Sequence, residues 1–123
     1  MRRGELKVWI ETWEGTPVVR AEGELDLGTL DQFRTATSEV MRRNPSAVIF
    51  DLRQVTFIDS SGLGILLATR KRLGSERSAV TVITQQPAVL NSLSTTGLDR
   101  YLCVVPEPLA AAATASSEAP GAA

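Results

Sequence analysis

The sequence VIFDLRQVTFIDSSGLGILLATRKRL, residues 48–73, passes from an apolar run into an amphipathic helix through Asp-Ser-Ser-Gly. The segment AVIFDL at 47–52 is almost continuously apolar, which is typical of a strand covered on both faces or lying centrally in a sheet. Leucines then recur at helical spacing and predict a buried stripe: Leu63, Leu66, Leu67 and Leu73. This helix begins near Ser60 or Ser61, so the polar residues at the junction either only cap it or also carry function.

Four further strands are predicted, at residues 6–15, 18–26, 79–84 and 101–105. A turn signal at 15–17 joins the first two strands into a hairpin. Two further helices run from Thr29 to Arg43 and from Pro87 to just before Gly97. The order β-β-α-β-α-β-α-β predicts an α/β fold with a mixed β-sheet packed with α-helices, because alternating strands and helices give parallel pairs.

Details of these elements are also predicted. Thr29 with Gln32 three residues later is typical of a capping box. In the third helix we expect Leu90 and Leu93 to point inward. Because Asp51 ends an apolar run, we interpret it as a turn residue at the end of a strand.

The two tryptophans, Trp9 and Trp13, stand four residues apart in the first strand. This even spacing puts both on one face, opposite Val8 and Ile10. They either form an exposed contact surface or are partly buried under the C-terminal tail.

The chain of 123 residues suits one domain, which we expect to span residues 1–108. Residues 109–123 are rich in Ala, Ser and Pro. Their alanines favour a short helix, and the Ser, Pro and Gly beyond it favour a disordered tail.

The composition excludes several classes of protein. Hydrophobic residues make up 43% and charged residues 22%, which indicates a globular chain. The net charge of −1 lacks the basic field that direct nucleic-acid binding needs. No apolar run approaches the ~20 residues that span a bilayer, and Glu5, Glu11 and Glu14 interrupt any signal-peptide core. We therefore expect a cytoplasmic protein with no membrane partner.

The side chains and motifs that most enzymes use for catalysis are scarce in this sequence. The chain has no histidine and a single cysteine, Cys103, which we expect to be a packing residue. It also lacks a cysteine cluster for zinc and a nucleotide-binding P-loop. We expect no catalytic residue, metal or cofactor.

The junction Asp59-Ser60-Ser61-Gly62 is explained in part by helix capping, which contributes about 1 kcal/mol. Glycine at positions 62 and 64 works against a stable helix, since each costs roughly 0.5–1 kcal/mol relative to alanine. We interpret these glycines as leaving the backbone bare, so that another surface approaches closely beside an accessible serine.

The segment 48–73, preceded by Gly23-Glu24-Leu25-Asp26, resembles the STAS domain, and within it the anti-sigma factor antagonists. The resemblance covers about residues 5–105. One departure is a single glycine, Gly74, where family members often carry two before the fourth strand. It bears on a loop and not on the serine motif.

The resemblance implies a regulatory switch without catalysis of its own. The unphosphorylated protein would bind a serine-kinase anti-sigma factor, which then releases its sigma factor. The kinase would phosphorylate Ser60, which weakens binding, and a metal-dependent serine phosphatase would reverse the modification. The implied partner-binding residues lie around the two motifs: Asp26, Asp59, Ser61, Gly62, Leu63 and Gly64.

Three other functions fit parts of the sequence. A STAS subunit of a lipid-transport complex or of a stress-signalling scaffold would use the same fold. A response-regulator receiver would use Asp51 as phosphoacceptor, but the chain has no adjacent acidic pair and no lysine after Lys71. A hydrolase using Ser60 or Ser61 lacks both the G-x-S-x-G motif and a histidine base.

Overall fold

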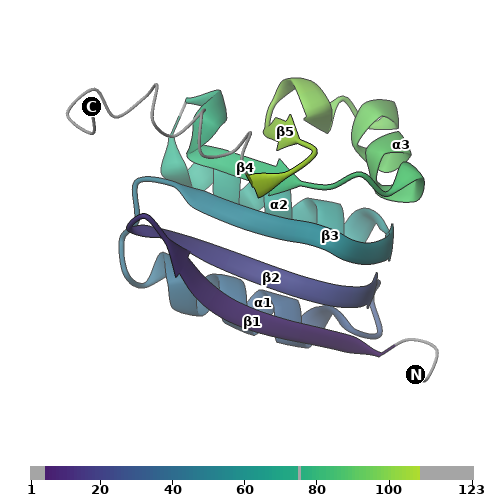
Figure 1. The fold of residues 1–123 in the computed structure, drawn as a ribbon, viewed down its shortest axis with the longest axis horizontal. Helices are drawn as coiled ribbons and strands as arrows, with labels where there is room; N and C mark the ends of the chain where they lie inside the picture. The colour runs from purple at the N-terminus through teal and green to yellow at the C-terminus, as the bar shows by residue number, and fades with distance from the viewer. Residues whose placement is uncertain (1–4, 75, 109–123) are drawn as a thin grey trace.

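The computed structural model describes residues 5–74 and 76–108, and its elements follow the predicted order (Figure 1). In chain order they are β1 (Leu6–Trp13), β2 (Thr16–Leu25), α1 (Leu30–Met41), β3 (Val48–Ile58), α2 (Ser60–Leu73), the 3-10 helix η1 (Arg77–Ala79), β4 (Val80–Ile83), α3 (Pro87–Thr95), the 3-10 helix η2 (Leu98–Arg100) and β5 (Cys103–Val105). The predicted α/β order is thus confirmed. The predicted tail at 109–123 lies outside the described residues, and the domain boundary at 108 stays a prediction.

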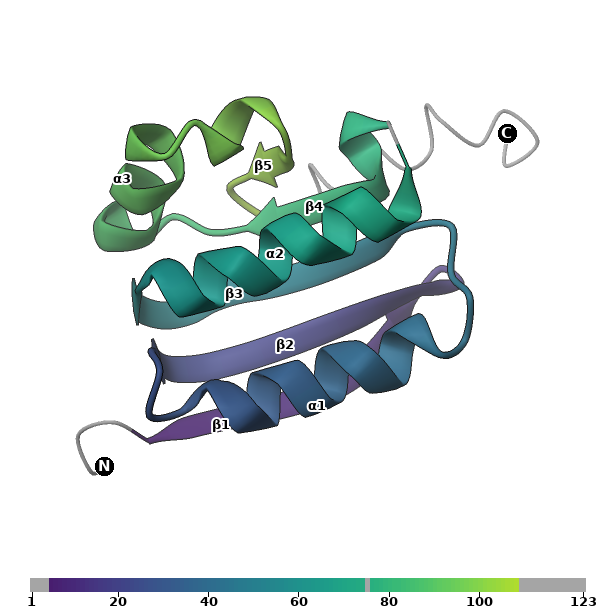
Figure 2. The same ribbon diagram turned by 180° about the vertical axis from the view of Figure 1, so that it is seen from behind.

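The five strands form one sheet in the order β1-β2-β3-β4-β5. β1 and β2 pair antiparallel, and every later pair of neighbours is parallel. Figure 2 shows α1 and α2 lying side by side on one face of the sheet. The opposite face, turned toward the viewer in Figure 1, is covered by neither of these helices.

The main hydrophobic core lies between the sheet and the helices. The rings of Phe33 in α1 and Phe50 in β3 are both fully buried, with centroids 5.5 Å apart. α3 adds Val89 and Leu93, which are four residues apart and therefore share one face of the helix. The prediction that Leu90 points inward is wrong, because it lies about 100° round the helix from Val89 and is 40% exposed.

The predicted hairpin is confirmed, but its turn lies earlier than expected. Trp13 pairs with Thr16, so the loop consists of Glu14 and Gly15 alone. Both have positive φ, 49° and 83°, as a two-residue turn of type I′ requires. Pro17, expected in the turn, is already part of β2.

The predicted capping box of Thr29 and Gln32 is wrong. The Thr29 hydroxyl donates to the carbonyl oxygen of Glu24 over 2.7 Å and accepts from the Asp26 N–H over 3.1 Å. It makes no capping hydrogen bond to α1. The hydroxyl is therefore used to fold the loop between β2 and α1.

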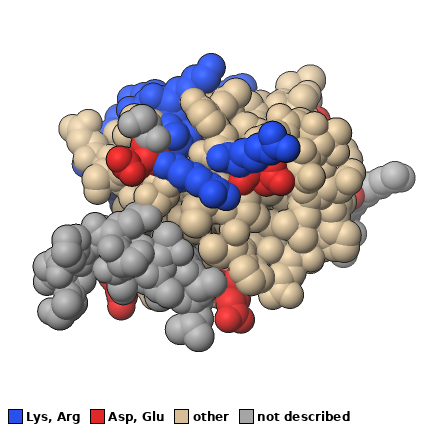
Figure 3. All heavy atoms as spheres, turned by 90° about the horizontal axis from the view of Figure 1, so that it is seen from above, with Lys and Arg blue, Asp and Glu red and all other residues tan. Residues whose placement is uncertain are grey.

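Arginines join the end of α2 to the segment before β5. Arg70 is buried, donates to the carbonyl oxygens of Tyr101 and Gly74, and lies over the Tyr101 ring. Arg77 donates to the carbonyl oxygens of Leu102 and Asp99. Figure 3, seen from above the view of Figure 1, shows several Lys and Arg side chains close together on this face of the molecule.

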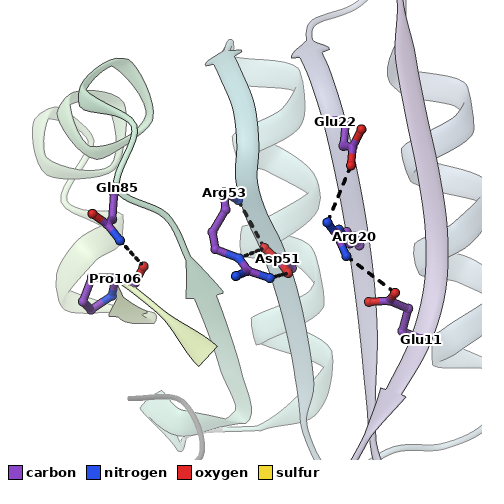
Figure 4. Close-up of polar contacts among 7 residues, drawn as sticks. All are labelled: Glu11, Arg20, Glu22, Asp51, Arg53, Gln85 and Pro106. Carbon is purple, nitrogen blue, oxygen red and sulfur yellow. Dashed lines mark hydrogen bonds and ion pairs between the residues drawn. The ribbon is translucent and has the colours of Figure 1, made fainter. Parts of the chain in front are cut away.

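Asp51 does not end a strand, since β3 continues to Ile58. Its carboxylate is buried and receives hydrogen bonds of 2.9 and 2.6 Å from the Arg53 guanidinium (Figure 4). Residues two apart in a strand share a face, which brings the two side chains together. Burial raises the pKa of Asp51, but the hydrogen bonds and charge of Arg53 outweigh it and hold the pKa below its ordinary value.

We expect Asp51→Asn to reduce the acid sensitivity of folding. A carboxyl group with a depressed folded pKa stabilises above its ordinary pKa of 3.8, and this contribution is lost as pH falls through the folded value. The asparagine variant should be about 1–2 kcal/mol less stable at pH 7 and should lose less stability below pH ~4. Urea unfolding across this range measures both effects. Asp31→Asn, which removes the same charge from a side chain 97% exposed, is the control. Equal acid sensitivity in Asp51→Asn and the wild type would contradict the prediction.

Candidate functional site at the start of helix α2

Asp59 is the N-cap of α2 and explains how this helix begins. Its Oδ1 atom accepts hydrogen bonds from the backbone N–H groups of Ser61, over 2.9 Å, and Gly62, over 3.3 Å. The Ser61 hydroxyl also donates to Oδ1. Asp59 therefore caps the helix, and the Ser61 hydroxyl adds a further hydrogen bond to its carboxylate.

Asp59 also holds the loop between β2 and α1 in place by hydrogen bonds. The second carboxylate oxygen of Asp59 accepts from the Leu27 N–H over 3.1 Å, and the Asp59 N–H donates to the Leu25 carbonyl over 3.0 Å. β2 and β3 are parallel and end at the same edge of the sheet, where Leu25 pairs with Ile58. Asp26, between the two bonded residues, is thereby brought to the site.

Asp59 carries its charge within this network. Burial raises its pKa, but the hydrogen bonds from Ser61, Gly62 and Leu27 outweigh burial and lower the pKa below its ordinary value. Among residues 5–74 and 76–108, no Lys or Arg forms an ion pair with Asp59 or Asp26. The site is therefore an anionic surface at neutral pH.

The two serines differ in accessibility. Ser60 is exposed, and its hydroxyl makes no hydrogen bond within the described part of the chain. Ser61 is half-buried, with its hydroxyl bound to Asp59. Only the Ser60 hydroxyl is free to accept a group that another protein supplies.

The two glycines also differ, and the interpretation of Gly62 as bare surface is wrong. Gly62 is buried, and a Cβ atom there would lie 2.8 Å from Ile58 Cγ1 and 2.9 Å from Leu25 Cγ. It lets α2 approach the ends of β2 and β3. Gly64 is exposed with open space around it, as a bare surface requires. Leu63 is buried in the core, so its side chain offers little to a partner.

Two apolar residues at this edge were not predicted as site residues. Leu27 is 75% exposed and lies two residues after Leu25, whose carbonyl oxygen accepts a hydrogen bond from the Asp59 N–H. Phe57 is 45% exposed and immediately precedes Ile58, near the end of β3. The sequence contains a signal for the exposure of Leu27, because this residue is apolar and stands between Asp26 and Gly28 in a loop. The exposure of Phe57 depends on a shift of register between β2 and β3, which the sequence does not reveal.

Residues 5–74 and 76–108 contain neither a candidate metal site nor a helix that could span a membrane. Within these described residues, no group of three or more His, Cys, Asp or Glu side chains is positioned to hold a metal ion. No helix in this part of the chain is long and apolar enough to cross a membrane.

Comparison with known proteins points to one family. The sequence model of the STAS domain matches residues 7–112. An anti-sigma F factor antagonist of Paenibacillus polymyxa is 33% identical over 98 residues, which are 79% of this chain and 84% of that protein. An anti-sigma-F factor antagonist of Mycobacterium tuberculosis is 34% identical over 95 residues, 74% of this chain and 78% of that protein. The crystal structure of an anti-sigma factor antagonist from Mycobacterium paratuberculosis superposes with a TM-score of 0.83 at 32% identity, covering 89% of this chain and 93% of that one.

The glycines give a matched pair of stability predictions. Gly62→Ala forces a methyl group against Ile58 and Leu25 and should destabilise the fold by about 1–3 kcal/mol. Gly64→Ala adds a methyl group in open space within a helix and should stabilise by up to about 1 kcal/mol. Chemical denaturation of both variants measures the difference, and equal stability of the two would refute the distinction.

Proposed function

The chain belongs to the STAS domain family, and from this we propose that it is an anti-sigma factor antagonist. Support comes from the two curated relatives and the solved structure, all of which carry that description. The observation that carries the proposal is the free, exposed hydroxyl of Ser60 beside an anionic, fixed Asp59. In this proposal the protein acts in the cytoplasm by binding other proteins and catalyses no reaction itself.

In the proposed mechanism the anti-sigma factor exchanges one partner for another: it binds either its sigma factor or this protein. The unphosphorylated protein binds a serine-kinase anti-sigma factor, which then releases its sigma factor. The kinase transfers a phosphoryl group from ATP to the Ser60 hydroxyl, and the modified protein no longer binds well. A serine phosphatase hydrolyses the phosphate ester and restores binding.

The electrostatics of the site favour such a switch. Phosphorylation adds about −1.5 to −2 charges beside the ionised Asp59. The N–H groups of Ser61 and Gly62, which would otherwise favour an anion at the helix start, already bind Asp59. A partner that buries Ser60 would therefore meet an uncompensated charge. A hundredfold loss of affinity requires only about 2.7 kcal/mol, so one phosphate suffices without a change of fold.

The proposed binding surface surrounds Ser60. Its polar part consists of Asp26, Asp59 and Ser61, and Gly64 provides open backbone on the next turn of α2. Leu27 and Phe57 add exposed apolar area at the same edge, and burial of apolar area favours association. Gly62 and Leu63 contribute through the position of α2 rather than by contact.

We predict phosphorylation on Ser60 and not on Ser61, because only the Ser60 hydroxyl is free. Incubation with the cognate kinase and ATP, followed by mass spectrometry of peptides across residues 54–70, measures the site. Ser60→Ala should abolish modification and retain kinase binding, whereas Ser60→Asp should weaken binding. Ser61→Ala is the matched control and should still be phosphorylated, with about 1 kcal/mol of stability lost.

Phosphate on Ser61 alone, or none with an active kinase, would overturn this assignment. Failure to bind any serine-kinase anti-sigma factor of the same genome would overturn the proposed function itself. Capture of the protein by a lipid-transport complex or by a stress-signalling scaffold would favour the other STAS roles.

We predict that Leu27→Ala and Phe57→Ala each weaken binding of the anti-sigma factor by about 1–3 kcal/mol, because each removes exposed apolar area that the partner would bury. Titration calorimetry measures the affinity. Leu90→Ala removes a leucine that is also exposed, 40%, but lies on α3, and it should leave affinity unchanged. If all three variants bind alike, Leu27 and Phe57 are not part of the interface.

A further inference from the structure

The two edges of the sheet differ in how they are protected. β5, at one edge, is three residues long and is followed directly by Pro106, which has no N–H to offer another strand. β1, at the other edge, is eight residues long, contains no proline and pairs only with β2 in the described part of the chain (Figure 1). A long edge strand presents a row of unpaired N–H and C=O groups. The edge at β1 is therefore open to a further strand.

Alternate residues of β1 direct their backbone groups to this free edge. In an antiparallel pair, every second residue exchanges hydrogen bonds with the neighbouring strand, and the residues between point away from it. The Glu5 carbonyl accepts from the Glu24 N–H, and the register of β1 and β2 runs on to Trp13 without a shift. Odd-numbered residues of β1 therefore bond to β2, and the N–H and C=O groups of the even-numbered residues face outward.

The side chains along the edge alternate between the two faces of the sheet. Val8 and Ile10 are partly buried and pack against the main core. Lys7, Trp9 and Glu11 are exposed, and their odd numbers place them together on the opposite face. Trp9 is 42% exposed and lies midway between a positive and a negative charge. Because the two charges are equally far from Trp9, they change places when the direction of the strand is reversed.

These two charges are incompletely compensated within the chain. The guanidinium of Arg20 lies 3.8 Å from Glu11 and 3.6 Å from Glu22, so one cation faces two carboxylates (Figure 4). Lys7 forms no ion pair within residues 5–74 and 76–108. A partner strand with a negative charge opposite Lys7 and a positive charge opposite Glu11 would therefore be favoured.

We propose that β1 pairs antiparallel with β1 of a second copy of this chain, about a twofold axis at Trp9, so that the two sheets become continuous. In this register Lys7 of each copy lies opposite Glu11 of the other, and Trp9 lies opposite Trp9. These are pairs without backbone hydrogen bonds, in which side chains approach most closely. Val8 lies opposite Ile10, and their outward N–H and C=O groups bond to each other.

Charge complementarity favours this register over its neighbours. A slide of one residue would set the outward-facing groups against groups that already bond to β2. A slide of two residues would place Lys7 or Glu11 opposite Trp9 and lose both ion pairs. A slide of four would place like charges opposite each other, which is destabilising. Because a single strand edge buries less area than a standard interface, the dimer should be weak.

Sedimentation of charge variants at protein concentrations up to about 1 mM tests the proposal. The wild type should dimerise. Lys7→Glu and Glu11→Lys each place like charges opposite each other, and each alone should weaken the dimer about tenfold. An equimolar mixture of the two variants should associate again, because every charge then meets its opposite. Lys71→Glu makes the same change on an exposed residue of α2 and should dimerise as the wild type does. A wild type that stays monomeric, or a mixture that associates no better than its components, would overturn the proposal.

Amide hydrogen exchange of the wild type, followed by NMR, measures the pairing without any substitution. The N–H groups of Val8, Ile10 and Thr12 face outward, so their exchange should slow as the protein concentration rises and the dimer forms. Trp9 and Glu11, whose N–H groups bond to β2 in a single copy, are the internal controls and should change much less. Equal slowing of the two sets, or exchange that is independent of concentration, would contradict the proposal.

Discussion

The Asp59 carboxylate binds three backbone N–H groups from two segments that are far apart in sequence, and the arrangement of the site depends on it. One oxygen receives the N–H groups of Ser61 and Gly62, and the other receives that of Leu27. Asparagine would keep an acceptor oxygen for only one of the two segments, and alanine would leave all three N–H groups without this partner. The start of α2 and the loop after β2 are therefore held by a single charged group.

This interaction separates two serines that are neighbours in the sequence. Asp59 engages the Ser61 hydroxyl as well as the first N–H groups of the helix, and it leaves the Ser60 hydroxyl exposed. In the structure Asp59 caps the helix and binds Ser61, which leaves Ser60 available for the proposed modification. The same carboxylate also provides the negative charge next to which a phosphate on Ser60 would lie. Asp59 would therefore take part in both the helix cap and the proposed switch.

Much of the fold could be predicted because it depends on local pattern. Hydrophobic periodicity gave the element order, and the Asp-Ser-Ser-Gly junction located the start of α2. Features that depend on neighbours in space could not be predicted. Gly62 is needed because of Ile58 and Leu25, and the Thr29 hydroxyl binds the Glu24 carbonyl in place of capping α1. Asp51 is tolerated inside β3 because Arg53 pairs with it.

Amide hydrogen exchange in Asp59→Ala, followed by NMR, tests most directly whether one carboxylate organises both segments. Loss of the side chain should accelerate exchange of the Leu27, Ser61 and Gly62 amides together, while amides in the middle of β3 keep their protection. If exchange accelerated only at Ser61 and Gly62 and Leu27 kept its protection, Asp59 would be a helix cap alone, and the account of the site would be contradicted.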